Sequence, residues 1–167
     1  MNTLRLRPTT FDDEEDVMSA HRKMLNDGFT FATGLRENEA WSEYLNRLDS
    51  YQYGQTGQWV PSTFLVADVG GKIVGRTSIR YELDDLLAHE GGHIGYGVVP
   101  SERRKGYATQ ILIQSLDIAH RAGIQRVLVT CVVDNKGSAT VIQRCGGVFD
   151  SVALSIDGSM VNRFWIE

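Results

Sequence analysis

The pattern of apolar and polar positions in the first third of the chain predicts one strand followed by two helices. Leu4 and Leu6 alternate with polar residues in the period-two pattern of a strand, and Pro8 ends it. The next segment, TTFDDEEDVMSAHRKML, has acidic residues in its first turns and basic residues later, which matches the helix dipole. A second helix is expected over residues 37–48, where apolar side chains recur at helical spacing, at Trp41, Tyr44, Leu45 and Leu48.

Turn residues and apolar runs in the rest of the chain predict two hairpins with further elements between them. A Gly-Gly pair separates two β-rich runs within residues 64–81, and Asp157-Gly158, a pair that favours a type I′ turn, separates two runs near the C-terminus. Between the hairpins we expect a strand at 93–99, a helix at 102–123, a buried strand at 126–133 and a short helix at 135–147. The order β-α-α-β-β-β-α-β-α-β-β predicts one α/β (α+β) domain over residues 1–167, built on a single sheet.

Composition and charge narrow the class of partner. The chain has 167 residues and a formal net charge of -4, which argues against broad electrostatic binding to nucleic acid. Its apolar runs are far shorter than the roughly 20 residues that cross a bilayer, and MNTLRLRPTT has no apolar signal-peptide core. Two isolated cysteines give neither a disulfide framework nor metal-ligand spacing. We therefore expect a cytoplasmic protein that binds small molecules and neither nucleic acid nor membrane.

The segment HEGGH at residues 89–93 matches the zinc-protease pattern H-E-x-x-H, in which two histidines one helical turn apart hold a metal. Gly91 and Gly92 each disfavour a helix by about 1 kcal/mol relative to alanine. Beyond them, Ile94, Tyr96 and Val98 alternate with glycines, so the chain leaves the motif as a strand. No third ligand follows at a usable spacing. We therefore expect no metal site.

The segment VVPSERRKGYATQIL indicates a binding site for an anion. Proline ends the strand, a basic turn containing Gly106 follows, and a helix begins near Tyr107. A helix N-terminus presents unpaired N–H groups and the positive end of the helix dipole, which together favour a phosphate. The small residues Gly106 and Ala108 allow phosphate oxygens to approach the backbone, and the neighbouring Arg and Lys side chains supply charge.

Together with NKGSATVIQRCGG, this segment resembles the GNAT superfamily of N-acetyltransferases over nearly the whole chain. The resemblance implies a mostly antiparallel central sheet of six to seven strands flanked by about four helices, with acetyl-coenzyme A as cosubstrate. The family motif R-x-x-G-x-A implies that the pyrophosphate is bound by Arg103, Gly106 and Ala108 and by the backbone from Arg104 through Lys105 and Tyr107 to Thr109. The resemblance further implies that Val98 and Val99 pair with pantetheine and that Asn135 and Ser138 contact the cofactor from the other side.

The catalytic groups are less defined by the sequence. His93, at the start of the strand, stands where a glutamate serves as base in the histone-acetylating branch of the family, and Glu90, Tyr96 and Glu82 are the alternatives. Many family members carry a tyrosine, seven residues after the asparagine, that protonates the leaving thiolate. Here that position is Ile142, which cannot donate a proton, so either Tyr107, Cys145 or water supplies it or the thiolate leaves unassisted.

The expected reaction is acetyl transfer to a primary amine of a small molecule by direct attack on the thioester. Two alternatives stay open, namely acetylation of a protein lysine or N-terminus, and a module that binds acyl-CoA without catalysis. The C-terminal strand MVNRFWIE offers an edge for pairing with a second subunit, so a homodimer is also an option.

Overall fold

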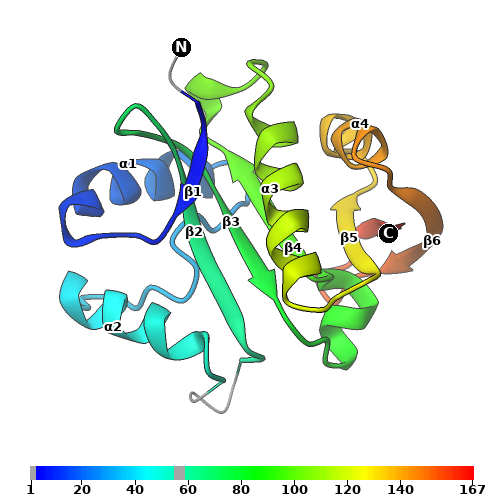
Figure 1. Cartoon of the computed structure of the whole chain (residues 1–167), viewed down its shortest axis with the longest axis horizontal. Coiled ribbons are helices and arrows are strands. Elements are labelled where there is room, and N and C mark those ends of the chain that lie inside the picture. The colour runs from blue at the N-terminus through cyan, green and yellow to red at the C-terminus, as the bar shows by residue number, and fades with distance from the viewer. Residues whose placement is uncertain (1–2, 55–58) are drawn as a thin grey trace.

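The computed structural model describes residues 3–54 and 59–167. Seven strands form one sheet in the order β1-β2-β3-β4-β5-β7-β6 (Figure 1). Their bounds are Arg5–Arg7 (β1), Ser62–Val69 (β2), Lys72–Arg80 (β3), Ile94–Val98 (β4), Val127–Val132 (β5), Val148–Leu154 (β6) and Met160–Ile166 (β7). Every pair of neighbours is antiparallel except β4 and β5. The predicted fold class, a mostly antiparallel sheet of six to seven strands, is confirmed.

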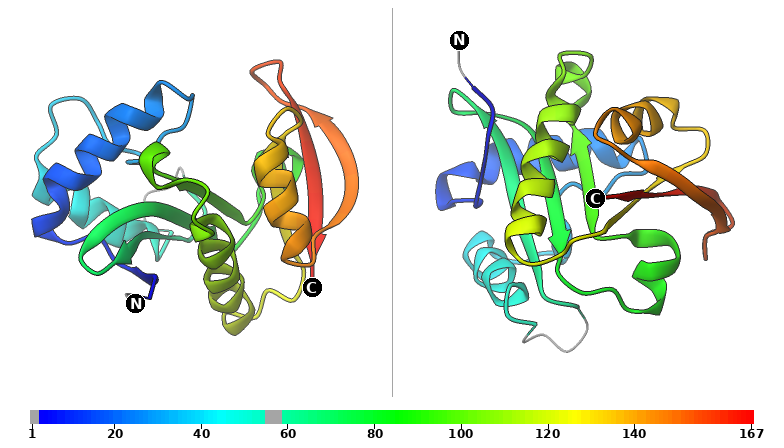
Figure 2. Two further views of the ribbon diagram at one scale, coloured as in Figure 1. Left: turned by 90° about the horizontal axis from the view of Figure 1, so that it is seen from above. Right: turned by 45° about the vertical axis from the view of Figure 1, so that its right-hand side comes forward.

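Four α-helices cover the two faces of the sheet. They are α1 (Glu14–Leu25), α2 (Trp41–Tyr51), α3 (Tyr107–Arg121) and α4 (Lys136–Arg144), accompanied by short turns at Phe11–Asp13 (η1), Leu87–Gly91 (η2) and Pro100–Glu102 (η3). Helices α1 and α2 lie on one side of β1–β4, while α3 crosses the opposite face beside α4 (Figures 1 and 2). None of the helices in the described ranges combines the length and the apolar character needed to cross a membrane.

Three apolar cores hold these layers together, the smallest of which packs Leu4, Val74 and Val98 against Ile111 of α3. The largest core joins α3 and α4 to β3, β4, β5 and β7, with Leu112 and Ile142 fully buried in it. The second core packs α1 and α2 against β2 and β3 through residues such as Met24, Trp41 and Tyr44. Each core consists of the apolar faces that the helical spacing predicts.

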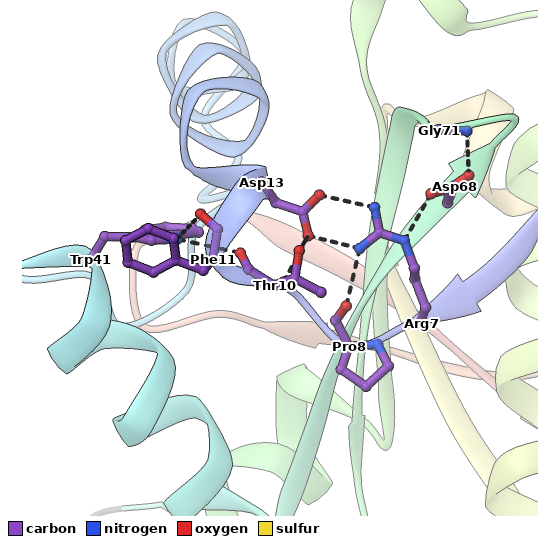
Figure 3. Close-up of polar contacts among 8 residues, drawn as sticks. All are labelled: Arg7, Pro8, Thr10, Phe11, Asp13, Trp41, Asp68 and Gly71. Atoms are coloured by element: carbon purple, nitrogen blue, oxygen red, sulfur yellow. Dashed lines mark hydrogen bonds and ion pairs between the residues drawn. The ribbon is translucent and has the colours of Figure 1, made fainter.

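An arginine on β1 fixes the N-terminal strand to the layer above it (Figure 3). Arg7 donates from Nη1 and Nη2 to the carboxylate of Asp13 at 2.7 and 2.9 Å, and from Nε to Asp68 Oδ2 at 2.7 Å. The indole N–H of Trp41 donates to the carbonyl oxygens of Thr10 and Phe11. Arg7 thus joins β1 to η1 and to the β2–β3 hairpin through two carboxylates that are both largely buried. Trp41 adds α2 to the same group of contacts.

Strands β4 and β5 lie side by side but pair at one position only, Ile94 with Val129. Beyond Ile94 the two parallel strands diverge, while β4 continues to pair with β3 as far as Val98. The sheet therefore contains an opening in its middle, between the second half of β4 and the second half of β5.

Two expectations about the C-terminal region are wrong. The Asp157-Gly158 pair does not form a two-residue turn, because β6 ends at Leu154 and β7 begins at Met160, so five residues connect them. Asp157 Oδ1 instead accepts hydrogen bonds from the backbone N–H and hydroxyl of Ser159. The C-terminal strand β7 is not an edge, since β5 and β6 flank it. The edge strands are β1 and β6.

Candidate functional site

The N-terminus of α3 opens toward solvent and has the backbone of an anion-binding turn. Gly106 is its N-cap residue with φ +81°, and Arg104 is also left-handed, with φ +65°. No side chain caps this end of the helix, so the first-turn N–H groups of Tyr107, Ala108 and Thr109 project forward. A Cβ placed on Gly106 meets no atom within 4 Å. Glycine is therefore required here by the backbone angle and not by crowding.

The basic residues of the turn differ in what they contact. Arg103 donates from Nε to Val98 O at 3.1 Å and from Nη2 to Asp27 at 2.7 Å, which ties the turn to β4 and to the end of α1. Lys105 pairs with Glu102 at 2.9 Å, and Lys72 pairs with the other oxygen of the same carboxylate. These two ammonium groups lower the pKa of Glu102 to about 2. Arg103 and Lys105 thus fix the shape of the turn, while the backbone N–H groups face outward.

The opening between β4 and β5 leaves main-chain groups of β4 without a neighbouring strand. Val99 donates its N–H to Val74 O on β3 at 2.9 Å, and alternate residues of an antiparallel strand bond to the same neighbour. Tyr96 and Val98 therefore direct their N–H groups away from β3, toward the opening. Of the two valines expected to contact the cofactor, Val98 has its N–H on this side and Val99 does not.

Tyr96 crosses the opening and contacts α4. Its hydroxyl lies 3.0 Å from Ser138 Oγ, and Ser138 is held in turn because its N–H donates to the Asn135 side chain, the N-cap of α4. Burial raises the pKa of Tyr96 to about 12, so the phenol keeps its proton at neutral pH. Ile142, at the position of the missing tyrosine, is fully buried in the core. At neutral pH the Tyr96 hydroxyl therefore has a proton that it could donate, and it is not ionised to act as a base.

His93 closes the narrow end of the opening. His93 is buried, and its ring Nδ1 accepts a hydrogen bond from the backbone N–H of Leu128 at 2.9 Å. The backbone N–H of His93 donates to Leu128 O at 2.7 Å. Burial and the nearby charge of Arg80 lower the pKa of the imidazole. The neutral ring then carries its proton on Nε2, and its basic nitrogen is already bonded. This arrangement fastens β4 to β5 and argues against His93 as the base.

Glu90 and His89 hold the short turn η2 against the β6–β7 connection. The carboxylate of Glu90 accepts from the hydroxyl of Ser155 and from the N–H of Ile156, and His89 Nε2 lies 2.8 Å from Leu154 O. The turn is helical, contrary to expectation, but it is one π-helical turn that stops at Gly92. Across residues 3–54 and 59–167 no three His, Cys, Asp or Glu side chains group as metal ligands.

Two arginines that the sequence reading missed lie on the face of β3 opposite α3. Arg76 and Arg80 stand four residues apart on the strand, so both side chains project to the side of α1, next to Gly95 and Gly97 of β4. Their signal in the sequence was two arginines at even spacing in the β-rich run KIVGRTSIR. That pattern identifies a polar strand face but not what covers it.

Comparisons with solved structures agree with this architecture. MccE, a microcin self-immunity acetyltransferase solved with acetyl-CoA and AMP, is 18% identical with a TM-score of 0.67, covering 97% of this chain and 91% of that one. The putative acetyltransferase yncA of Salmonella typhimurium, solved with acetyl-CoA, is 15% identical with a TM-score of 0.68, covering 99% and 94%. RimL, a ribosomal alpha-N-protein acetyltransferase, is 22% identical with a TM-score of 0.61, covering 99% and 90%. At these identities the likeness concerns the fold.

The sequence comparisons are more specific. No curated protein gives a significant match. The family model described as "Acetyltransferase (GNAT) family" matches residues 34–147, which include β2–β5, α3 and α4 and therefore both the anion-binding turn and the opening in the sheet. The chain belongs to the GNAT family of acetyltransferases.

Proposed function

We propose that the protein transfers the acetyl group of acetyl-CoA to a primary amine of a small molecule, by direct attack of the amine on the thioester. The observation that carries this proposal is the opening between β4 and β5 with the uncapped N-terminus of α3 at its wide end. An extended chain ending in a diphosphate fits both features together, because one end needs backbone N–H donors and the other needs a strand edge.

The residues present fit acetyl-CoA, which supplies an activated acyl group when bound. The first-turn N–H groups of α3, with Gly106 at the N-cap, hold the diphosphate, and Arg104 adds charge beside them. The N–H of Val98 faces the opening, where it pairs with the pantetheine chain or donates to the developing oxyanion. Asn135 and Ser138 line the opposite wall through α4.

Tyr96 is the residue to which we assign the proton for the departing thiolate. Its phenol is protonated at neutral pH, lies in the opening, and contacts Ser138 on the far side. It takes over the role of the tyrosine that Ile142 replaces. His93 and Glu90 position β4 and η2 in this proposal, and the amine loses its proton to solvent before attack.

Acetylation of a protein N-terminus is the second candidate, and it is favoured by the likeness to RimL. A free-thiol release assay with acetyl-CoA separates the two. We expect turnover with small primary amines, including free amino acids. Peptides that begin with one of those amino acids should give no turnover. Turnover on peptides alone would transfer the assignment to protein substrates. Tight CoA binding with no transfer to either class would leave a binding module.

A further inference from the structure

Arg76 is a buried cation with an incomplete set of partners. It is 8% exposed, and its Nε has no hydrogen-bond partner. Nη2 donates to Thr30 O at 2.6 Å, while Nη1 makes longer contacts of 3.3 and 3.4 Å with Ser78 Oγ and Gly95 O. The guanidinium lies 4.4 Å from the centre of the Phe29 ring. Two neighbouring nitrogens of a guanidinium can bind a carboxylate with two parallel bonds, and on Arg76 the unpartnered Nε, which is itself buried, belongs to such a pair.

Arg80 is the second cation on this face, and it lies directly over β4. Its Nη1 donates to the carbonyl oxygens of Gly91 and Gly92, both at 3.1 Å. A Cβ built on Gly95 would be 3.4 Å from Arg80 Nη2 and 3.2 Å from Ser78 Oγ. Gly95 and Gly97 are partly exposed although β4 is the central strand of the sheet. Arg80 and Ser78 therefore lie over Gly95, whereas Gly97 is covered, because a Cβ built there would be 2.6 Å from the Phe29 ring and 3.0 Å from the terminal methyl group of Met24.

No carboxylate neutralises this pair. Neither Arg76 nor Arg80 lies within 4.0 Å of an Asp or Glu oxygen in the part of the chain that the structure describes, and residues 1–2 and 55–58 contain neither Asp nor Glu. Asp84 acts on Arg80 only from a longer distance. Burial and mutual repulsion lower the pKa of Arg76 to about 9. Two buried like charges without a counter-ion are unfavourable, and an anion between them removes that penalty.

We propose that Arg76 and Arg80 bind an anionic group of the acceptor, so that the substrate is an amine carrying a carboxylate, as in an amino acid. This inference rests on the proposed acetyltransferase function. The anion would lie over Gly95, and the N–H groups of Tyr96 and Val98 follow one and three residues later on the same strand, roughly 3 to 10 Å away. An amine on the carbon that bears the carboxylate, or on one of the next carbons, spans that distance. Gly95 places no side chain between the anion and Arg80, whereas Phe29 and Met24 cover Gly97 and limit the acceptor to the Gly95 end of the strand.

The test compares each of a set of amino acids with its methyl ester and with the amine that lacks the carboxyl group, by free-thiol release from acetyl-CoA. We expect kcat/KM for the acid to exceed that for the ester by about tenfold or more. The ester has the less basic amine, so amine ionisation favours the ester and cannot produce this preference. An aminoalkyl phosphonate arm shows whether the site prefers a planar or a tetrahedral anion.

Three variants locate the preference on the protein. Arg80→Met is expected to bring the acid-to-ester ratio close to one by raising KM for the acid while leaving the ester unchanged. Gly95→Ala keeps both charges but places a methyl group against Arg80 Nη2, so it should lower the ratio as well. Kinetic results for Arg76→Met are interpreted only if its thermal unfolding matches that of the wild type, because Arg76 also donates a hydrogen bond to Thr30 O. Arg121→Met, at an exposed pair on the far end of α3, is the control.

The outcomes separate this inference from the function on which it rests. Turnover that is equal for acids and esters, or a ratio that survives both Arg80→Met and Gly95→Ala, would overturn the anion site and leave the acetyltransferase in place. Loss of activity toward acids and esters alike in Arg80→Met would assign the arginine a purely structural role and also overturn it. Failure of every amine and peptide would instead remove the proposed function.

Discussion

At the scale of single residues, Tyr96 is the side chain whose chemistry is most sharply defined by its surroundings. It is half-buried, keeps its proton at neutral pH, and lies in the opening beside the main chain of β4. Tyr96→Phe should lower kcat by roughly 100-fold, in the range typical of a lost general acid, with little change in KM for acetyl-CoA. Steady-state kinetics by thiol release measures both parameters.

Ser138→Ala is the matched control for that prediction. It removes the hydrogen-bond partner of Tyr96 but leaves the phenol in place, so kcat should stay within a few-fold of wild type. A Tyr96→Phe enzyme with full kcat would show that the thiolate leaves without this proton.

His93 leads to a prediction about stability rather than rate. Its folded-state pKa lies below the ordinary value of 6.5, so the unfolded chain binds a proton more readily than the folded one. The stability that His93 contributes is therefore present above pH 6.5 and is lost as the pH falls below it. His93→Asn, whose side-chain oxygen can accept from Leu128, should reduce this loss in urea unfolding measured from pH 7.5 to 5.

The exposed His120→Asn on α3 serves as control for the same titration. If His93→Asn unfolds with the same pH dependence as the wild type, the imidazole does not carry the effect. His93→Leu, which leaves the Leu128 N–H without an acceptor, should cost about 1 to 3 kcal/mol at pH 7.5 and less as the pH falls.

The residues of the site were predictable to different degrees, for a physical reason. Gly106 and its neighbours lie within one turn of a helix start, so a local pattern contains the whole site. His93 looked like a base because its partner Leu128 is 35 residues away and supplies only a backbone N–H. Arg76 and Arg80 were missed because the absence of a partner carboxylate is a property of the folded chain.

At the scale of elements, the conformation at the start of α3 makes a testable prediction about Gly106. Alanine there should destabilise the fold by about 1 to 2 kcal/mol, since φ is +81°. Its methyl group also enters the space in front of the helix, so acetyl-CoA affinity should fall at least about tenfold. Calorimetric binding and denaturant unfolding measure the two effects separately.

The same helix provides the control. Gly123 follows the other end of α3, has φ +94°, and has no atom within 4 Å of a built Cβ. Gly123→Ala should therefore cause a similar loss of stability with unchanged acetyl-CoA affinity. Equal affinities of Gly106→Ala and Gly123→Ala would contradict the anion-binding role of this turn.

Most elements followed from periodicity, and the failures came from turns and edges. The amphipathic helices and apolar strands were identified because each buries one face against a single sheet. The connection at Asp157-Gly158 was misjudged because Ser159 bonds locally to Asp157 and lengthens the loop. The position of β7 in the sheet depends on pairing with β5, which no local pattern contains.

At the scale of the whole molecule, the contacts of Arg7 determine how the N-terminal strand is retained. Arg7→Met leaves the carboxylates of Asp13 and Asp68 without their main cation and should cost about 3 kcal/mol at pH 7. Arg7 lowers the pKa of both acids, so the stability they contribute is present above their ordinary pKa near 3.8 and is lost as the pH falls. The variant should therefore show a weaker acid dependence in urea unfolding.

The surface pair Arg121–Asp117 is the comparison at this scale, since both side chains are more than half exposed. Arg121→Met should change the free energy of unfolding by less than about 1 kcal/mol. An Arg7→Met protein as stable as Arg121→Met would mean that the clamp in Figure 3 contributes little.

The single pairing of Ile94 with Val129 has a mechanical consequence. Beyond this pair, β4 and β5 share no ladder of main-chain hydrogen bonds, and in our proposal the pantetheine chain of acetyl-CoA bonds to β4 in place of β5. Amide hydrogens of Tyr96 and Val98 should exchange rapidly with deuterium in the free protein, although they belong to a central strand, and slowly once CoA is added. In every catalytic cycle, the hydrogen bonds between β4 and the cofactor would then form when acetyl-CoA binds and break when CoA leaves.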